Sequence, residues 1–317
     1  MVSSLMLLLL FFTVRLICLY QCKQCKQRFS FFTISKIIFL SKNLKIQKSM
    51  ERYLAKSIFD VVDKNILITG GSRGIGLMMT KVLAANGANV FVSSRNQKNC
   101  DEVVSSLTKN GCNAFSVPED VSTNEGCQSL AKSISSHTQE LHGLVNNSGA
   151  TWGQSFEDYD EVGWSKCFDL NVKACFQLTR ACLPMLKNAS TSEDPSRVVN
   201  IGSVTGFQHQ PFPTYAYDTS KAAVHSLTKK LAYELASDNI TVNAVAPGYV
   251  PTKMSGQLDA YGKEEKGMST KVPMGRLGCD TDMGGVIMFL CGRGSGAWVT
   301  GTVITVDGGT LARPLVI

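Results

Sequence analysis

The stretch Asn65–Gly76 reads NILITGGSRGIG and decides the fold. Its first five residues form a short apolar run that ends at a glycine turn, which predicts a buried strand. A helical pattern follows over residues 77–85. Gly70 permits a tight turn, Gly74 lets the backbone approach a pyrophosphate, and Gly76 allows the helix to pack closely on the strand. Because a helix N-terminus offers unpaired N–H groups to an anion, the turn predicts a dinucleotide site. Its expected contacts are Gly70, Ser72, Arg73, Gly74, Ile75 and Gly76.

A second predicted strand, residues 89–93, ends in a sequence that selects the cofactor. Sites for NAD usually have Asp or Glu at this position, where the carboxylate binds the ribose hydroxyls of the adenosine. This chain has Ser93-Ser94-Arg95 instead, and Arg73 supplies a second positive charge. A 2′-phosphate would be attracted there, so Ser94 and Arg95 predict NADP(H). The alternative is that both arginines are ordinary solvated loop residues.

Alternating strand and helix patterns continue along the chain. Residues 113–117 form a third apolar run, followed by Asp120 and Val121, which are placed to contact an adenine. Residues 141–145 form a fourth, followed by small polar residues that let a nucleotide lie against the sheet edge, among them Asn147, Ser148 and Gly149. The alternation predicts an α/β fold, a single doubly wound parallel sheet of about seven strands with helices on both faces.

The candidate reacting groups are Tyr217 and Lys221, in a predicted helix over residues 215–237. A spacing of four puts them one turn apart on the same face. A neighbouring ammonium favours a phenolate, so we expect Lys221 to lower the pKa of Tyr217 from its reference value of ~10. An apolar run at residues 198–201 would bring Ser203 to the sheet edge, where its hydroxyl would hold a substrate oxygen. Tyr and Lys one turn apart also occur by chance on surface helices, so the pair gains weight only from the dinucleotide turn upstream.

Positive charge is concentrated at the N-terminus. The 317 residues include 32 basic and 25 acidic side chains, but residues 1–50 alone hold eight basic and no acidic ones. The rest of the chain, with 24 basic and 25 acidic residues, is nearly neutral. The charge therefore gives no reason to expect a nucleic-acid partner.

The same fifty residues carry two apolar patches, residues 5–20 and 29–40. Each patch is interrupted by a basic residue and is shorter than the ~20 residues of a membrane span. Three interpretations remain open: a signal peptide or anchor, an organellar transit peptide, or sequence upstream of a start at Met50. We expect a basic apolar extension over residues 1–50 and one catalytic domain over residues 51–317. A cytoplasmic or a mitochondrial location, and any membrane contact, depend on the fate of the extension.

Eleven cysteines are scattered along the chain. Cys22 and Cys25 form a Cys-x-x-Cys pair, but no second pair follows at zinc spacing, so we predict no metal site. The others, such as Cys167, Cys175 and Cys182, fall in helical patterns beside Phe and Leu. This placement predicts buried free thiols in a reducing compartment.

Over residues 56–309 the chain resembles the short-chain dehydrogenase/reductase family. Four motifs occur in the family's order: the glycine turn, Asn146–Gly149, Ser203, and Tyr217-x3-Lys221. Asn171 matches the family's fourth catalytic residue. Pro247-Gly248 and Asp307-Gly308-Gly309 also fit the pattern. Residues 147–153, 200–204 and 273–276 resemble in particular the rhamnolipid-biosynthesis type of 3-oxoacyl-(acyl carrier protein) reductase. The sequence departs from the pattern at Ser148, Gly202 and Asp218, where alanine, a second serine and a small residue are usual.

The resemblance implies a Rossmann-type fold, NADP(H) as cofactor and hydride transfer to a carbonyl. Tyr217 would donate the proton and Ser203 would position the oxygen. Lys221 would lower the pKa of Tyr217 and hold the nicotinamide ribose, while Asn171 would shape its helix so that a water connects Lys221 with solvent. Further cofactor contacts are implied at Pro247, Gly248, Val250 and Thr252.

The substrate side is less specific in sequence. Residues 247–271 are long for a connection and predict a mobile lid. Several large side chains either line an apolar pocket or belong to the core: Trp152, Phe207, Phe212, Tyr249, Met254 and Met268. The helical pattern over residues 159–186 carries an apolar stripe that fits either a homodimer or homotetramer contact or a monomer core: Leu170, Phe176, Leu178 and Leu183.

We therefore predict an NADPH-dependent reductase of a 3-oxoacyl thioester, carried on acyl carrier protein or CoA. The alternatives are an alcohol, polyol or steroid dehydrogenase of the same family and a non-catalytic protein that binds NADPH. The presence of Ser203, Tyr217 and Lys221 argues against the last. We expect no chemical role for His209, in a proline-rich loop, or for His225, on the catalytic helix.

Overall fold

The computed structural model describes residues 50–252 and 265–312. The chain divides into two units, Met1–Ser57 and Ile58–Ile317. The described part of the first unit contains most of the short helix α3 (Ala55–Ile58). The boundary expected at residue 50 stays a prediction. The rest of the predicted extension, and residues 253–264 of the predicted lid with Met254, lie outside the described residues.

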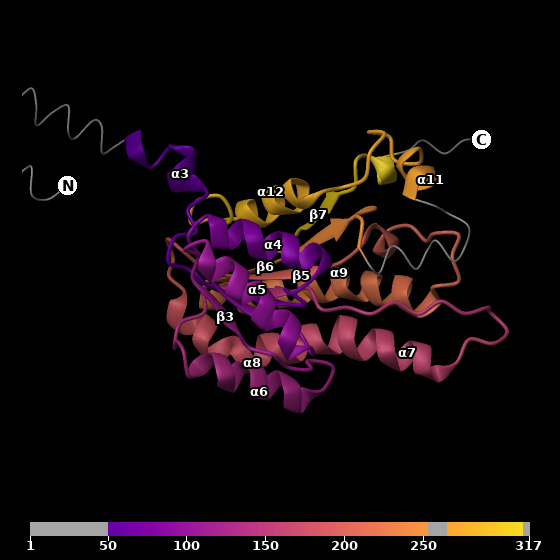
Figure 1. Ribbon diagram of the computed structural model, residues 1–317, viewed down its shortest axis with the longest axis horizontal. Coiled ribbons are helices and arrows are strands. Elements are labelled where there is room, and N and C mark those ends of the chain that lie inside the picture. Colours follow the sequence, from indigo (N-terminus) through magenta and orange to yellow (C-terminus); the bar gives the residue numbers. More distant parts are fainter. Residues whose placement is uncertain (1–49, 253–264, 313–317) are drawn as a thin grey trace, which may run out of the picture. The chain divides into compact units, whose positions relative to one another are not determined.

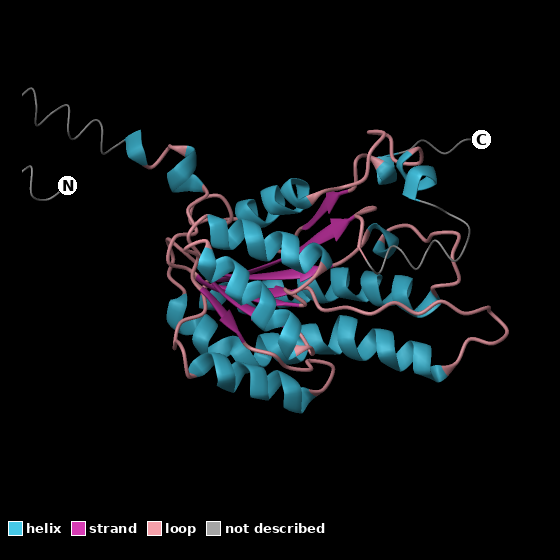
Figure 2. Ribbon diagram, viewed as in Figure 1, coloured by secondary structure: helices cyan, strands magenta, loops and turns pink. Residues whose placement is uncertain are grey.

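A single parallel sheet forms the centre of the second unit (Figure 2), with the strand order β3-β2-β1-β4-β5-β6-β7. The order reverses at β1, since β2 and β3 lie on one side of it and β4 on the other. Such a switch point opens a crevice at the carboxyl ends of the strands, where ligands bind. The predicted doubly wound α/β fold is confirmed. The strands are β1 (Asn65–Thr69), β2 (Asn89–Ser93), β3 (Ala114–Ser116), β4 (Gly143–Asn146), β5 (Ser196–Ile201), β6 (Ile240–Pro247) and β7 (Val303–Val306).

Helices cover both faces of the sheet because successive strand residues point to opposite sides. Ile66 and Ile68 pack in one core cluster with α4, α5 and α12, whereas Leu67 packs in the other with α6, α8 and α9. Figure 1 shows α12 and α4 above the sheet and α8 and α6 below it. The main helices are α4 (Gly74–Ala85), α5 (Gln97–Lys109), α6 (Asn124–Ser135), α7 (Glu161–Phe168), α8 (Ala174–Ala189), α9 (Tyr215–Leu235), α11 (Glu265–Ser269) and α12 (Asp280–Cys291).

The helix predicted over residues 159–186 contains an irregularity that the apolar pattern does not reveal. Between α7 and α8 lies a π-helical segment, η1 (Asp169–Lys173). Asn171 is at its centre and is 1% exposed. Single π-helical turns inside helices are frequent at functional sites.

A cluster of charges is buried at the amino ends of β1 and β5. Asp194 contacts Lys64 at 2.6 Å, Arg197 at 3.2 Å and Arg293 at 2.8 Å. The Lys64 and Arg197 side chains are only 2% and 1% exposed. Arg197 also donates to the carbonyls of Leu290 and Gly292, so the cluster joins β5 to the end of α12.

The eight cysteines of the described residues are all free, and Cys167, Cys175 and Cys182 are buried, as predicted. Within the same ranges, no helix combines the length and the hydropathy needed to span a bilayer.

Candidate active site

The glycine turn after β1 has the backbone that only glycine adopts without strain. Gly70 and Gly74 have φ angles of 64° and 53°, in the left-handed region. A Cβ on Gly76 would lie 2.2 Å from the carbonyl oxygen of Gly70, so the helix packs directly on the turn. Helix α4 begins after Arg73 with no side-chain cap. Its first N–H groups therefore remain available for an anion such as a pyrophosphate.

Asn147, which follows the neighbouring strand β4, and Thr69, at the end of β1, fix this turn. The Asn147 side-chain amide donates to the carbonyls of Thr69 at 2.8 Å and Gly70 at 3.3 Å. The Thr69 hydroxyl accepts from the backbone N–H groups of Asn147 and Ser148, both at 3.0 Å. Asn147 and Ser148 were predicted from the sequence, whereas Thr69 was not, because its only signal is a hydroxyl at the end of β1.

The carboxyl end of β2 lies beside the glycine turn, as the cofactor prediction requires. Ser72 donates to the Ser94 hydroxyl at 3.0 Å. Arg73 and Arg95 are both exposed, and neither guanidinium has a carboxylate partner among the described residues. This edge thus presents hydroxyls and two uncompensated cations.

The segment after β3 also ends at the carboxyl edge. The Asp120 carboxylate accepts the backbone N–H of Ser122 at 3.0 Å, which fixes its orientation. Val121 is 4% exposed and packs with the core cluster that contains α6.

The residues after β6 complete the predicted cofactor set. Pro247 pairs with Val306 of β7, and Gly248 lies so close to Asp307 that a Cβ would be 2.8 Å from its Cα. Val250 is buried in the same core cluster as α4. A Cβ on Gly74 would lie 3.2 Å from the methyl carbon of Thr252. Thr252 therefore lies against the glycine turn, from the opposite side of the switch point.

Ser203, Tyr217 and Lys221 meet at the carboxyl end of β5. Ser203 follows this strand and is 7% exposed, while Lys221 is 5% exposed. The Lys221 ammonium donates to the carbonyl of Ile201 at 2.7 Å and lies 5.7 Å from the centre of the Tyr217 ring. The Ser203 hydroxyl forms a hydrogen bond with the phenol, which favours the phenolate.

The expected pKa shift of Tyr217 is wrong for this structure. Burial, the largest cause, raises its pKa to about 12, and the negative charge of Asp218 adds to the rise. The Ser203 hydrogen bond opposes the shift without reversing it. Burial also lowers the pKa of Lys221 to about 8. Sequence spacing reveals the charge of the nearby ammonium but not the desolvation of the two groups, which dominates here.

Asn171 joins three parts of this site. Its amide nitrogen donates to the carbonyl of Ala150 at 2.9 Å and to the Ser220 hydroxyl at 2.8 Å. Its oxygen accepts the backbone N–H of Ala150 at 2.8 Å. The π-helical segment thus holds the strand end at Gly149 and Ala150 against the catalytic helix. A Cβ on Gly149 would be 3.7 Å from the Lys221 nitrogen.

The two histidines differ in setting. His225 is 6% exposed, and neither ring nitrogen has a hydrogen-bond partner. Its ring lies against Phe207, with 4.5 Å between centroids, and fills the space left by Gly202 and Gly206. Burial lowers its pKa to about 4, so it is neutral at physiological pH. His209 is exposed in the loop before α9.

The large side chains considered for a pocket do not form one group. Met268 is 5% exposed, whereas Phe207 is 54% exposed. Trp152 packs on Gly163 of α7, with Lys166 above its ring at 4.6 Å. The apolar stripe predicted over residues 159–186 is also divided, since Leu178 is in the core and Phe176 is 43% exposed.

The fold and these motifs define a dehydrogenase of the Rossmann type, and comparison with known families agrees. The profile of the short chain dehydrogenase family matches residues 64–261, and the chain belongs to this family of oxidoreductases. It is 38% identical over 252 residues to the rhamnolipids biosynthesis 3-oxoacyl-[acyl-carrier-protein] reductase of Pseudomonas aeruginosa, covering 79% of this chain and 97% of that protein.

Solved structures agree with the sequence comparison. The NADP active-site complex of Pseudomonas aeruginosa RhlG superposes with a TM-score of 0.76 at 37% identity, covering 80% of this chain and 98% of that one. An Agrobacterium tumefaciens structure with bound NADP, described as a 2-deoxy-D-gluconate 3-dehydrogenase, superposes with a TM-score of 0.72 at 32% identity. It covers 81% of this chain and 100% of that one.

Proposed function

We propose that this protein is an NADPH-dependent reductase of carbonyl compounds and that its substrate is a 3-oxoacyl thioester. The observation that carries the proposal is the meeting of Ser203, Tyr217 and Lys221 at the carboxyl end of β5, on the same edge of the sheet as the glycine turn. The likeness to a 3-oxoacyl-(acyl carrier protein) reductase supports the choice of substrate.

The residues present fit NADP(H). The uncapped N-terminus of α4 and the two left-handed glycines suit a pyrophosphate. Arg73 and Arg95, with no acidic residue at Ser93-Ser94, suit a 2′-phosphate and disfavour NAD by lacking the usual carboxylate. When bound, NADPH supplies the hydride.

Tyr217 is the proposed proton donor. Because its pKa is raised to about 12, the phenol is fully protonated at neutral pH and carries the proton that the reduced oxygen needs. An alkoxide is more basic than a phenolate, so donation remains favourable despite the raised pKa. The Ser203 hydroxyl, close enough to bond the phenol, orients the same oxygen.

Lys221 and Asn171 support this donor. The Lys221 amine, with its pKa lowered to about 8, exchanges a proton readily near neutral pH and is held in place by the Ile201 carbonyl. Asn171 keeps the end of β4 and the catalytic helix at a fixed separation. The phenolate left after the reaction therefore lies next to a group able to return a proton.

A second candidate is the oxidation of a polyol or sugar acid, which the likeness to the gluconate-type structure favours. Both candidates use the same reacting groups and differ in substrate and direction.

A panel assay followed by NADPH absorbance distinguishes them. The panel holds acetoacetyl-CoA, an acetoacetyl group on acyl carrier protein, simple ketones, and polyols or 2-deoxygluconate with NADP. We expect reduction of acetoacetyl thioester, faster with NADPH than with NADH. Oxidation of the sugar acid without any thioester reduction would contradict the proposal. Light scattering of the same preparation would test the expected homodimer or homotetramer. Mass spectrometry of the mature N-terminus would show whether residues 1–50 are retained.

A further inference from the structure

A loop of residues 204–214 connects the Ser203 end of β5 to the catalytic helix. It starts with the single 3-10 turn η2 (Val204–Gly206). Its last residues are connected by short-range backbone hydrogen bonds. The N–H of Phe212 donates to the carbonyl of Gln210, and the N–H of Thr214 donates to the carbonyl of Phe212, both at 2.8 Å. The loop therefore starts beside one reacting group and ends beside the other.

Asp218 holds this loop from the first turn of α9. Its carboxylate accepts the Thr214 hydroxyl at 3.2 Å. The Gln210 backbone N–H also favours its charged form by hydrogen bonding. One half-buried carboxylate thus interacts with the middle and the end of the loop.

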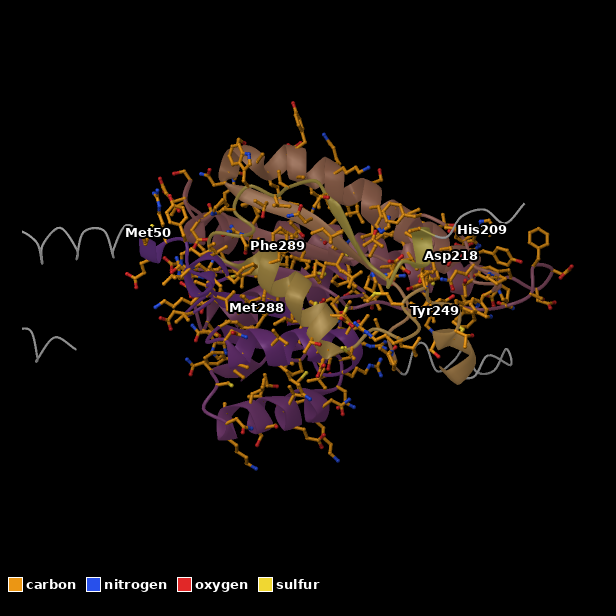
Figure 3. All side chains as sticks on the ribbon, turned by 90° about the horizontal axis from the view of Figure 1, so that it is seen from above. Met50, His209, Asp218, Tyr249, Met288 and Phe289 are labelled. Carbon is orange, nitrogen blue, oxygen red and sulfur yellow. The ribbon has the colours of Figure 1, made fainter. Side chains whose placement is uncertain are left out.

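Gln210 extends the connection to the other side of the site. Its side-chain oxygen accepts the Tyr249 hydroxyl at 2.9 Å. Tyr249 follows Gly248 at the end of β6, and its carbonyl accepts the N–H of Gly278 at 2.9 Å. Figure 3 shows His209, Asp218 and Tyr249 at the same end of the catalytic unit, away from Met288 and Phe289. The segments after β5 and β6 are joined by this contact.

Three titratable groups lie around Asp218. Burial raises the pKa of Asp218, while His209 of the loop favours its charged form. Burial also raises the pKa of Tyr159, just before α7, and of Tyr217, the neighbour of Asp218 in α9, and the Asp218 carboxylate adds to both rises. The Tyr159 hydroxyl accepts the N–H of Ala216 at 3.1 Å, so Tyr159 lies against the first turn of α9, as Asp218 does.

We propose that Asp218 is a positioning residue of the reductase. Its carboxylate fixes the 204–214 loop against the catalytic helix, and through Gln210 and Tyr249 it sets the placement of the segment after β6. This inference rests on the proposed function, because it assigns roles relative to the proton donor of that reaction.

The test separates the hydrogen bonds of the carboxylate from its charge with three variants assayed at neutral pH. Asp218→Ala removes the acceptor of the Thr214 hydroxyl and should raise KM by roughly 3- to 10-fold, because the 204–214 loop loses its bond to α9. Asp218→Asn removes the charge but keeps an acceptor for Thr214, and it should restore KM to near the wild-type value. Tyr249→Phe removes the hydroxyl that bonds Gln210 and should also raise KM by roughly 3- to 10-fold.

A matched control is Asp238→Ala, which makes the same truncation just beyond the other end of α9, where Asp238 pairs with exposed Lys187 at 2.9 Å. It should leave KM unchanged. Should Asp218→Ala fail to fold by thermal melting, Thr214→Val removes the same 3.2 Å bond from the loop side and should raise KM to a similar extent.

An unchanged KM in both Asp218→Ala and Tyr249→Phe would overturn the proposal. If the wild type does not reduce acetoacetyl thioester, the proposed substrate fails separately. KM is then measured for the same variants with whichever carbonyl of the panel the wild type does reduce, and the values decide the role of Asp218 by the same criteria.

Discussion

Substitution of Gly76 by alanine tests whether the glycine turn is held by direct backbone contact. The new methyl carbon would lie 2.2 Å from the Gly70 carbonyl oxygen and 2.4 Å from the Asn147 amide nitrogen. Both distances are about 1 Å or more short of a normal contact. Neither neighbour is free to move, because Asn147 is itself bonded to Thr69 and Gly70.

The expected cost follows from two opposing terms. Overpacking of this kind costs about 1–3 kcal/mol. Alanine in place of glycine inside a helix returns up to about 1 kcal/mol. We expect a net loss of roughly 1–2 kcal/mol in the free energy of unfolding, which lowers Tm by roughly 3–8 °C in a domain of this size. NADPH affinity should fall by about 10-fold or more, because displacing Gly70 moves the groups that face the pyrophosphate.

Thermal denaturation and fluorescence titration with NADPH measure the two effects. Gly285→Ala is the matched control, since Gly285 is also helical, in α12, and a Cβ there meets nothing within 4 Å. It should keep NADPH affinity and raise stability by about 0.5–1 kcal/mol. A Gly76→Ala protein with wild-type Tm and wild-type NADPH affinity would refute the contact argument.

Three other outcomes follow from the structure. Arg95→Ala should weaken NADPH binding by about 10-fold or more and leave NADH binding nearly unchanged, because only NADPH has the 2′-phosphate; equal losses in titrations of both cofactors would count against the clamp. Asp194→Asn should lower the free energy of unfolding by about 3–5 kcal/mol in denaturant melts, because it leaves buried Lys64 and Arg197 without a counter-charge. Glu102→Gln, which breaks an exposed pair at 4.0 Å, should change it by less than about 1 kcal/mol. The free energy of unfolding should also fall as pH is lowered from 6.5 to 4. The pKa of His225 is lowered to about 4 in the folded protein, so the unfolded chain takes up a proton first. His225→Gln should reduce this dependence on pH, and an unaltered dependence would exclude His225 as its source.

Much of the fold was readable from local pattern. Residues 65–69 and 89–93 were predicted as strands and are β1 and β2. They are buried apolar runs bounded by turns, for which pattern alone suffices. The helix predicted over residues 215–237 is α9 as far as Leu235, and the next residues form the 3-10 segment η3 (Ala236–Asp238).

Other features depend on tertiary context that no local pattern carries. Arg197 would be read as an exposed strand end, yet it is 1% exposed, with its Nε and Nη2 atoms bonded to Asp194 and to carbonyls near α12. The π-helical turn at Asn171 looks like ordinary helix in sequence, because the bonds of that amide to Ala150 and Ser220 are tertiary contacts. The Tyr217 pKa was mispredicted for the same reason, because spacing gives proximity but not burial.

The most direct test of the account is single-turnover reduction by Tyr217→Phe in parallel with NADPH titration. We expect the rate of hydride transfer to acetoacetyl thioester to fall by about 100-fold or more, with NADPH affinity within about 2-fold of wild type. A Phe variant that reduces the thioester at the wild-type rate would contradict the account, because the phenol would then not be the source of the proton.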